Sequence, residues 1–179
     1  MTEDPTADDV PVSGRPVASV TRRASRAAGP SSAETLAPSA TILIRLMVGA
    51  VFLSEGIQKF LYPESVGAGR FADIGFPNPE LLSQFVGSVE IVCGSLVVVG
   101  LFTRAAVIPL VAIMLVAIVT TKVPILLATD VGPFQVRQLS RYGPWSMAHE
   151  SRTDFSMLMG SLFLLFVGAG RLSLDALRR

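Results

Sequence analysis

The sequence is poor in the residues that carry most metal and thiol chemistry. Its single cysteine, Cys93, excludes an internal disulfide and a two-cysteine redox relay within the chain. Its single histidine, His149, leaves no cluster of histidines that could bind a metal ion. We therefore expect no metal site and no covalently attached cofactor.

Charged residues are also scarce. They make up 16% of the 179 residues, whereas hydrophobic residues make up 50%. A soluble domain usually carries about 25% charged residues. The net charge of +1, and the lack of a basic stripe with interleaved aromatic residues, argue against nucleic acid as a partner.

The apolar residues fall in long runs that do not alternate with polar ones. A run of about 18 or more apolar residues can cross roughly 30 Å of hydrocarbon as a helix. The sequence therefore predicts an all-α fold, a four-transmembrane-helix bundle in the lipid bilayer, within a membrane domain at 39–179. The predicted spans cover residues 40–61, 81–102, 105–128 and 154–170.

The first 38 residues have a different composition. They are rich in Asp, Ser, Ala, Pro and Arg and have no hydrophobic periodicity, which is typical of a disordered segment. Arginines are more frequent in the segments on the side of the two termini than in the loops on the other side, which predicts cytoplasmic termini. We thus expect a multi-pass protein of the bacterial plasma membrane, with residues 1–38 as a disordered cytoplasmic tail.

Several ionisable residues lie inside or at the ends of the predicted spans. Each costs about 2.5–3.5 kcal/mol near the centre of a membrane helix, so such residues are candidates for function. At 1.5 Å per residue, most of them fall in the outer half of the bilayer. The candidate ligand-binding residues are Arg45, Glu55, Lys59, Glu90, Lys122, His149 and Asp154.

Two interpretations of these charges remain open. The acids and bases can neutralise each other as structural ion pairs, with Glu55 and Lys59 in the favourable i,i+4 order on one helix. Alternatively, they line a polar pocket open to the outer leaflet, where a quinone headgroup or a small polar substrate binds. Glu90 is the best candidate for a catalytic residue, because a side chain at mid-depth cannot easily reach the headgroups.

Small residues and a proline modify the spans. Gly56, Gly87, Gly94 and Gly160 predict close helix packing, since small residues let backbones approach each other in a membrane. Pro124 lies near the far end of the third span and predicts a kink or an early end there.

Short motifs in order along the chain resemble the DoxX family. Residues 45–49 (RLMVG) and 54–60 (SEGIQKF) resemble its opening helix, and residues 75–77 (GFP) resemble its loop before helix two. Residues 90–104 are similar to its E-x-x-x-G…G-L-x-T-R signature, and residues 168–175 (GAGRLSLD) to its G-x-G-x-x-S-L-D ending. The resemblance covers about residues 40–177.

The resemblance implies a four-helix protein of the bacterial plasma membrane. Many members are described as quinone-linked, or as membrane anchors for soluble redox and thiol-defence proteins. Many also carry a glutamate at the start of helix four, where this chain has His149, Glu150 and then Asp154.

The leading hypothesis is a membrane subunit of a redox assembly that binds quinone, or a soluble redox partner, through the region of Glu55, Lys59 and Glu90. In such a site a bound quinone carries the electrons, and Glu90 relays protons. The alternative is a non-catalytic scaffold or assembly factor whose charges serve helix packing. A small-solute transporter ranks third, because the sequence shows no inverted repeat. The sequence leaves the electron donor, the partner and a homo-oligomeric state open.

Overall fold

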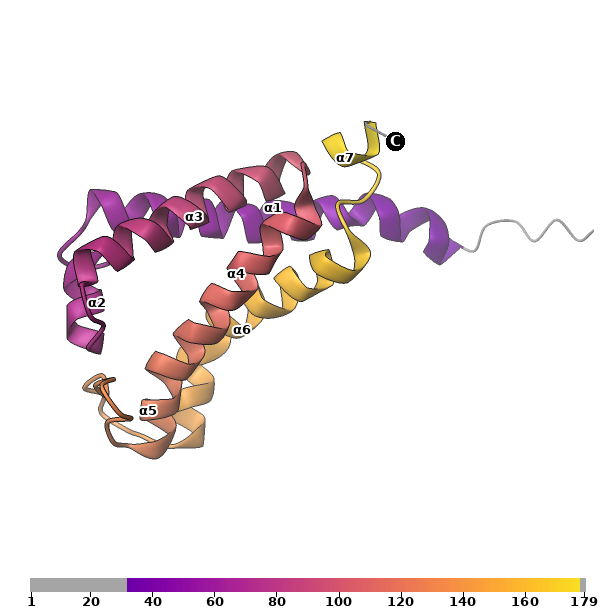
Figure 1. Ribbon diagram of the computed structural model, residues 1–179. Helices are drawn as coiled ribbons and strands as arrows, with labels where there is room; N and C mark the ends of the chain where they lie inside the picture. Colours follow the sequence, from indigo (N-terminus) through magenta and orange to yellow (C-terminus); the bar gives the residue numbers. More distant parts are fainter. Residues whose placement is uncertain (1–31, 178–179) are drawn as a thin grey trace, which may run out of the picture.

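The computed structural model describes residues 32–177, with side chains from residue 39 (Figure 1). Within these residues the chain forms helices and one isolated β-bridge, between Val131 and Phe134. The predicted all-helical fold is confirmed. The elements are α1 (Ser32–Leu61), α2 (Ala68–Ile74), α3 (Pro79–Val99), α4 (Thr103–Ala117), the π-helical turn η1 (Ile118–Lys122), α5 (Val123–Leu127), α6 (Pro144–Val167) and α7 (Leu174–Leu177).

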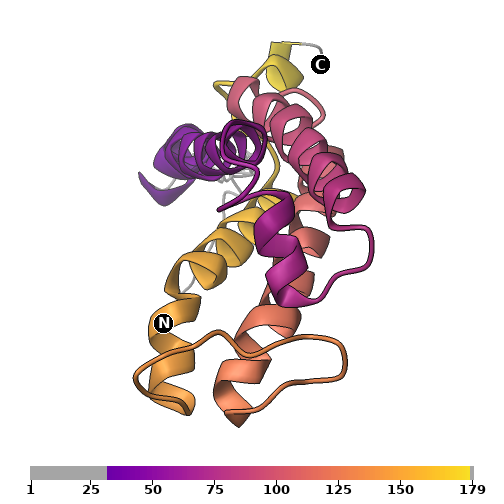
Figure 2. The same cartoon turned by 90° about the vertical axis from the view of Figure 1, so that its left-hand side faces the viewer.

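The long helices form two pairs. Helix α1 packs along α3, and α4 packs along α6 (Figures 1 and 2). The pairs meet where α3 ends, α4 begins and the chain turns into α7, which we call the α7 end. They diverge towards the opposite end, where α1 ends and α2 lies, which we call the α2 end.

The apolar core lies in the half of the bundle nearer the α7 end. It contains Val97 from the end of α3, Leu110 from the first half of α4 and Leu164 from the end of α6, all fully buried. Val48 and Phe52 add the middle of α1 to this cluster. Packing is therefore densest where the two helix pairs meet.

Glycines bring the backbones of α1 and α3 into contact. A Cβ atom added at Gly56 would lie 2.7 Å from the carbonyl oxygen of Gly87, and one at Gly94 would lie 2.8 Å from the nitrogen of Leu53. Neither position has room for a side chain, which agrees with the predicted role of these glycines in close packing.

Among the residues that the structure describes, three helices are long and apolar enough to cross a membrane. They are Ser39–Leu61, Pro79–Val99 and Thr103–Leu127, and their ends differ from those of the first three predicted spans by at most three residues. Helix α6 occupies the place of the fourth, but it begins at Pro144 and ends at Val167. Because Glu150, Arg152 and Asp154 lie in its first half, it does not reach the same apolar length.

The start of α1 also differs from the prediction. The helix begins at Ser32, so residues 32–38 of the predicted tail are helical. Residues 1–31, the rest of that tail, lie outside the described residues.

Pro124 lies in the first turn of α5, and the helical path continues to Leu127, so the predicted early end does not occur there. The proline has no N–H group to bond the carbonyl four residues earlier. The helix widens into η1 just before it, and the backbone N–H of Val123 bonds the carbonyl of Ile118, five residues back. The π-helical turn thus contains one residue more than an α-helical turn, and bulges of this kind often occur at functional sites.

Candidate functional site

A cavity of about 530 Å³ lies between the two helix pairs, towards the α2 end. We call it the ion-pair cavity. Five of the seven predicted site residues line it, from α1, α3, η1 and α6: Glu55, Lys59, Glu90, Lys122 and Asp154. Residues that are distant in the sequence therefore meet around one space, as their similar predicted depths suggested.

The first ion pair joins α1 to α3. Lys59 Nζ lies 2.6 Å from Glu90 Oε2, and the two side chains are 9% and 3% exposed. The same ammonium group also donates to the backbone oxygen of Glu55, at 3.4 Å. The glycines lie directly beside this pair: a Cβ added at Gly56 would lie 3.0 Å from Glu90 Cβ, and one added at Gly87 would lie 3.4 Å from Lys59 Cβ.

The second ion pair lies on the other side of the cavity. Lys122 Nζ is 3.1 Å from Asp154 Oδ2, and these side chains are 9% and 23% exposed. Lys122 is the last residue of η1, so the π-helical turn determines the direction of its side chain. Thr120 and Thr121 line the same wall, and their hydroxyls donate back to the carbonyls of Val116 and Ala117.

Glu55 lies near the first pair without joining it. Its side chain is exposed and lines the cavity. No carboxylate–cation contact of Glu55 is present among the described residues. Glu150 also lines the cavity and pairs with Arg137, so the cavity holds two carboxylates more than its two ion pairs use.

Aromatic and polar residues complete the walls, and several were not predicted from the sequence. Phe71, Phe76 and Arg70 come from α2 and its C-terminal end, between the first two predicted spans, where no helix was predicted. Phe52 and Phe85 come from α1 and α3. The aromatic residues of the GFP motif were the available signal, but single apolar residues in a loop do not identify a cavity wall.

The loop before α6 packs against α2 at this end. The Phe76 ring lies 5.2 Å from that of Phe134 and 5.4 Å from that of Phe71, between ring centroids. The backbone N–H of Gln135 donates to the carbonyl of Ile74. Gly75, with φ of 99°, adopts a left-handed conformation against Pro133, where a Cβ would collide with the carbonyl oxygen.

The other two predicted site residues lie outside the cavity. The ring nitrogens of His149 are 3.1 Å from the guanidinium of Arg152, on the exposed side of α6. Arg45 lies at the α7 end, where it is 3% exposed and donates to the backbone oxygens of Val98 and Ala169. The structure thus does not bring these two together with the other candidates.

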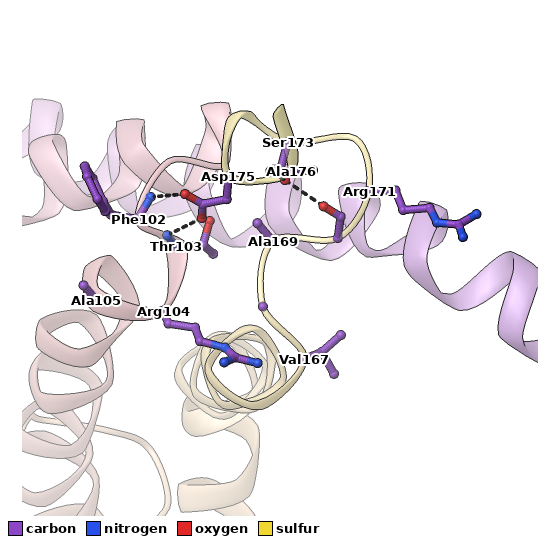
Figure 3. A pocket seen from close by; sticks show the side chains of 12 residues that line it. Phe102, Thr103, Arg104, Ala105, Val167, Ala169, Arg171, Ser173, Asp175 and Ala176 are labelled. Atoms are coloured by element: carbon purple, nitrogen blue, oxygen red, sulfur yellow. Dashed lines mark hydrogen bonds between the residues drawn. The ribbon is translucent and has the colours of Figure 1, made fainter. Parts of the chain in front are cut away.

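The C-terminal segment, residues 168–177, forms a second cavity at the α7 end with the start of α4 (Figure 3). The Asp175 carboxylate accepts hydrogen bonds from the backbone N–H groups of Phe102 and Thr103, at 2.8 and 3.1 Å. Arg104 donates to the carbonyl of Phe166. The charged groups here bind the backbone at helix ends, which is the contribution of a helix cap.

The described residues contain no group of three or more His, Cys, Asp or Glu side chains that could hold a metal ion. The ionisable groups that line the ion-pair cavity are two ammonium groups, one guanidinium group and four carboxylates, beside aromatic walls. Such a set can donate hydrogen bonds to ligand oxygens and exchange protons with them.

Comparisons with known proteins agree with the motifs. The family model named DoxX matches residues 40–123. The chain is 54% identical over 138 residues to the uncharacterized membrane protein Rv3486 of Mycobacterium tuberculosis, a match that covers 77% of this chain and 80% of that protein. It is 26% identical over 135 residues to a Bacillus subtilis protein named "Putative oxidoreductase CatD", covering 75% and 84%. No solved structure gives a significant match. This chain belongs to the DoxX family of membrane proteins.

Proposed function

We propose that this protein is the membrane subunit of a redox assembly and that the ion-pair cavity binds a quinone headgroup. The observation that carries the proposal is the pairing of two acid–base couples, Lys59–Glu90 and Lys122–Asp154, across one cavity between membrane helices. The volume of about 530 Å³ is within the usual range of small-molecule sites.

The residues present fit the two ends of a quinone ring. Each lysine ammonium can donate a hydrogen bond to a carbonyl oxygen, and each neighbouring carboxylate can take part in proton exchange. The aromatic side chains of Phe52, Phe71 and Phe85 supply apolar surface for the ring. A bound quinone supplies two-electron, two-proton chemistry, and a soluble redox partner supplies or removes the electrons.

Glu90 is the residue that we propose to hold or release a proton in this site. Its side chain is 3% exposed and contacts Lys59 directly. A buried carboxylate next to an ammonium group can pass a proton to a ligand oxygen without exposing the charge to lipid. The name of the CatD relative is consistent with redox chemistry, although it describes that protein and not this one.

A scaffold role is favoured by one specific observation. The Lys59–Glu90 pair and the glycine contacts together join α1 to α3, so the pair can serve helix packing alone. A protein of that kind would anchor a soluble partner without binding a ligand in the cavity.

The test is purification in native lipid, followed by mass spectrometry of co-purified quinones and proteins. We expect stoichiometric quinone in the wild type, its loss in Glu90→Gln and its retention in Glu80→Gln. Glu80 is an exposed acid in the first turn of the same helix and does not line the cavity, so it is the matched control. Circular dichroism and gel filtration check that each variant is folded.

The other outcomes separate the alternatives. A co-purified soluble redox protein without quinone would identify a membrane anchor. A folded wild-type protein with neither ligand nor partner would contradict the redox proposal and leave the packing role.

A further inference from the structure

Three apolar residues of the ion-pair cavity also lie on the outer surface of α3 and α4. Phe85 of α3 is 64% exposed and Val116 of α4 is 51% exposed, although both line the cavity. Ala112, one helical turn before Val116, also lines the cavity and is exposed. A residue that faces both the cavity and the outside of the bundle marks an opening, which here lies between α3 and α4.

The depth of these residues places the opening in hydrocarbon. Phe85 lies six residues after the start of α3 at Pro79, about 9 Å along the helix axis. Val116 lies 11 residues before the end of the third candidate span at Leu127, about 16 Å along its axis. Both helices are among the three that can cross a membrane, so their exposed faces at these depths contact lipid chains.

Away from α3 and α4, the exposed residues that line the cavity are charged or polar: Glu55, Arg70 and Thr153. The wall from α2 includes Phe71 and Phe76, and the loop before α6 packs on this wall through Phe134. Towards α3 and α4, by contrast, the surroundings change from the ion pairs in the interior to apolar side chains and then lipid at the opening.

We infer that the cavity opens laterally into the bilayer between α3 and α4, through an opening formed by Phe85, Ala112 and Val116. The ligand is then an amphipathic molecule whose polar head lies at the ion pairs and whose hydrocarbon tail leaves through this opening. Resting on the proposed function, the inference specifies the ligand as a quinone with a long isoprenoid tail, taken up from the membrane and not from water.

The test compares two ligands that share one headgroup. Menaquinone carries an isoprenoid tail, and menadione has the same naphthoquinone ring without it. Binding of each is measured on the full chain in lipid nanodiscs by native mass spectrometry. Ala112→Phe fills the opening with a bulky side chain, and Leu115→Phe makes the same change at a position that is 50% exposed on α4 but does not line the cavity.

We expect Ala112→Phe to weaken menaquinone binding by about tenfold or more while menadione binding changes little, since about 1.4 kcal/mol corresponds to a factor of ten. Leu115→Phe is expected to bind both ligands like the wild type. A menaquinone analogue with a photoreactive group on its tail should crosslink to α3 and α4.

Two results would overturn the inference in distinguishable ways. If both ligands bind and Ala112→Phe behaves like the wild type, with crosslinks on α2, the lateral opening is wrong and the quinone site stands. If the folded wild-type protein binds neither ligand, the proposed quinone site itself is wrong, and the inference about its tail is wrong with it.

Discussion

Buried charge is held in different ways at the two ends of the bundle. At the α7 end, Arg45 donates to the backbone oxygens of Val98 and Ala169, and Asp175 accepts from the N–H groups that begin α4. At the α2 end, Lys59 and Lys122 instead contact carboxylates on other helices, beside a cavity.

The difference shows which membrane charges are candidates for function. A charged group that satisfies backbone atoms at a helix end replaces hydrogen bonds that lipid cannot supply. A charged side chain paired with another charged side chain satisfies no backbone requirement of the fold. An apolar pair of similar volume could replace it without loss of stability. Pairs of this second kind, next to an open cavity, are therefore expected to be kept for a ligand.

The largest expected effect is the loss of one partner of the Lys59–Glu90 pair. Glu90→Leu leaves a buried, unpaired ammonium group and should lower the free energy of unfolding by about 3–5 kcal/mol. The double variant Lys59→Met/Glu90→Leu removes both charges and should recover most of this loss. Denaturant titration in detergent micelles measures both variants against the wild type. A double variant as unstable as the single one would show that the α2 end depends on the pair for folding.

Arg45 should behave in the opposite way. Arg45→Met leaves two buried carbonyl oxygens without donors, at a cost of about 2–3 kcal/mol in the free energy of unfolding. Since the partners are backbone atoms, no second substitution can restore stability by removing them. Quinone bound per folded molecule, measured in the same preparation, should remain that of the wild type. Loss of quinone from the folded fraction would mean that the two ends are not independent.

Asp175 is expected to have a smaller effect of the same kind. Asp175→Ala removes the carboxylate that caps α4 and should cost about 0.5–2 kcal/mol. Asp175→Asn keeps one acceptor oxygen and is expected to fall between the wild type and the alanine variant. Thermal unfolding of the three proteins checks this order. An asparagine variant less stable than the alanine variant would contradict a capping role.

Most of the helices, and the ionisable residues around the cavity, could be predicted from the sequence. Long apolar runs and the cost of charge in lipid identified the helices and the ionisable candidates, and helix depth grouped Glu55, Lys59, Glu90 and Lys122 correctly. What depth could not provide was the partner of each charge. Arg45 was listed as a candidate because it is an ionisable residue within a predicted span, while its partners in the structure are the carbonyls of Val98 and Ala169.

The remaining differences also have physical causes. Helix α2 was missed because the prolines and glycines between the first two spans, such as Gly67 and Gly69, indicate a loop, yet these two glycines fit tightly at the start of a short helix. The start of α6 was placed ten residues late, at Asp154, because residues such as Glu150 and Arg152 made the first turns of the helix too polar to be part of a membrane span. Hydrophobic composition identifies the apolar part of a membrane helix. It does not identify polar turns that belong to the same helix.

The smallest expected effect on stability, Lys122→Met, makes the clearest distinction between the two ends. The partner, Asp154, is 23% exposed, so its carboxylate can be solvated when the ammonium is lost, and we expect a stability change of about 1 kcal/mol or less. Quinone binding should nevertheless fall, because Lys122 supplies the hydrogen-bond donor on the η1 side of the cavity. Arg152→Met is the matched control, since Arg152 lies on α6 two residues before Asp154 but is exposed and does not line the cavity. A Lys122 variant with normal quinone binding would place the ligand at the Lys59–Glu90 pair alone. A variant with normal stability and weakened binding would show that this charge is kept for the ligand, whereas the charge of Arg45 is kept for the fold.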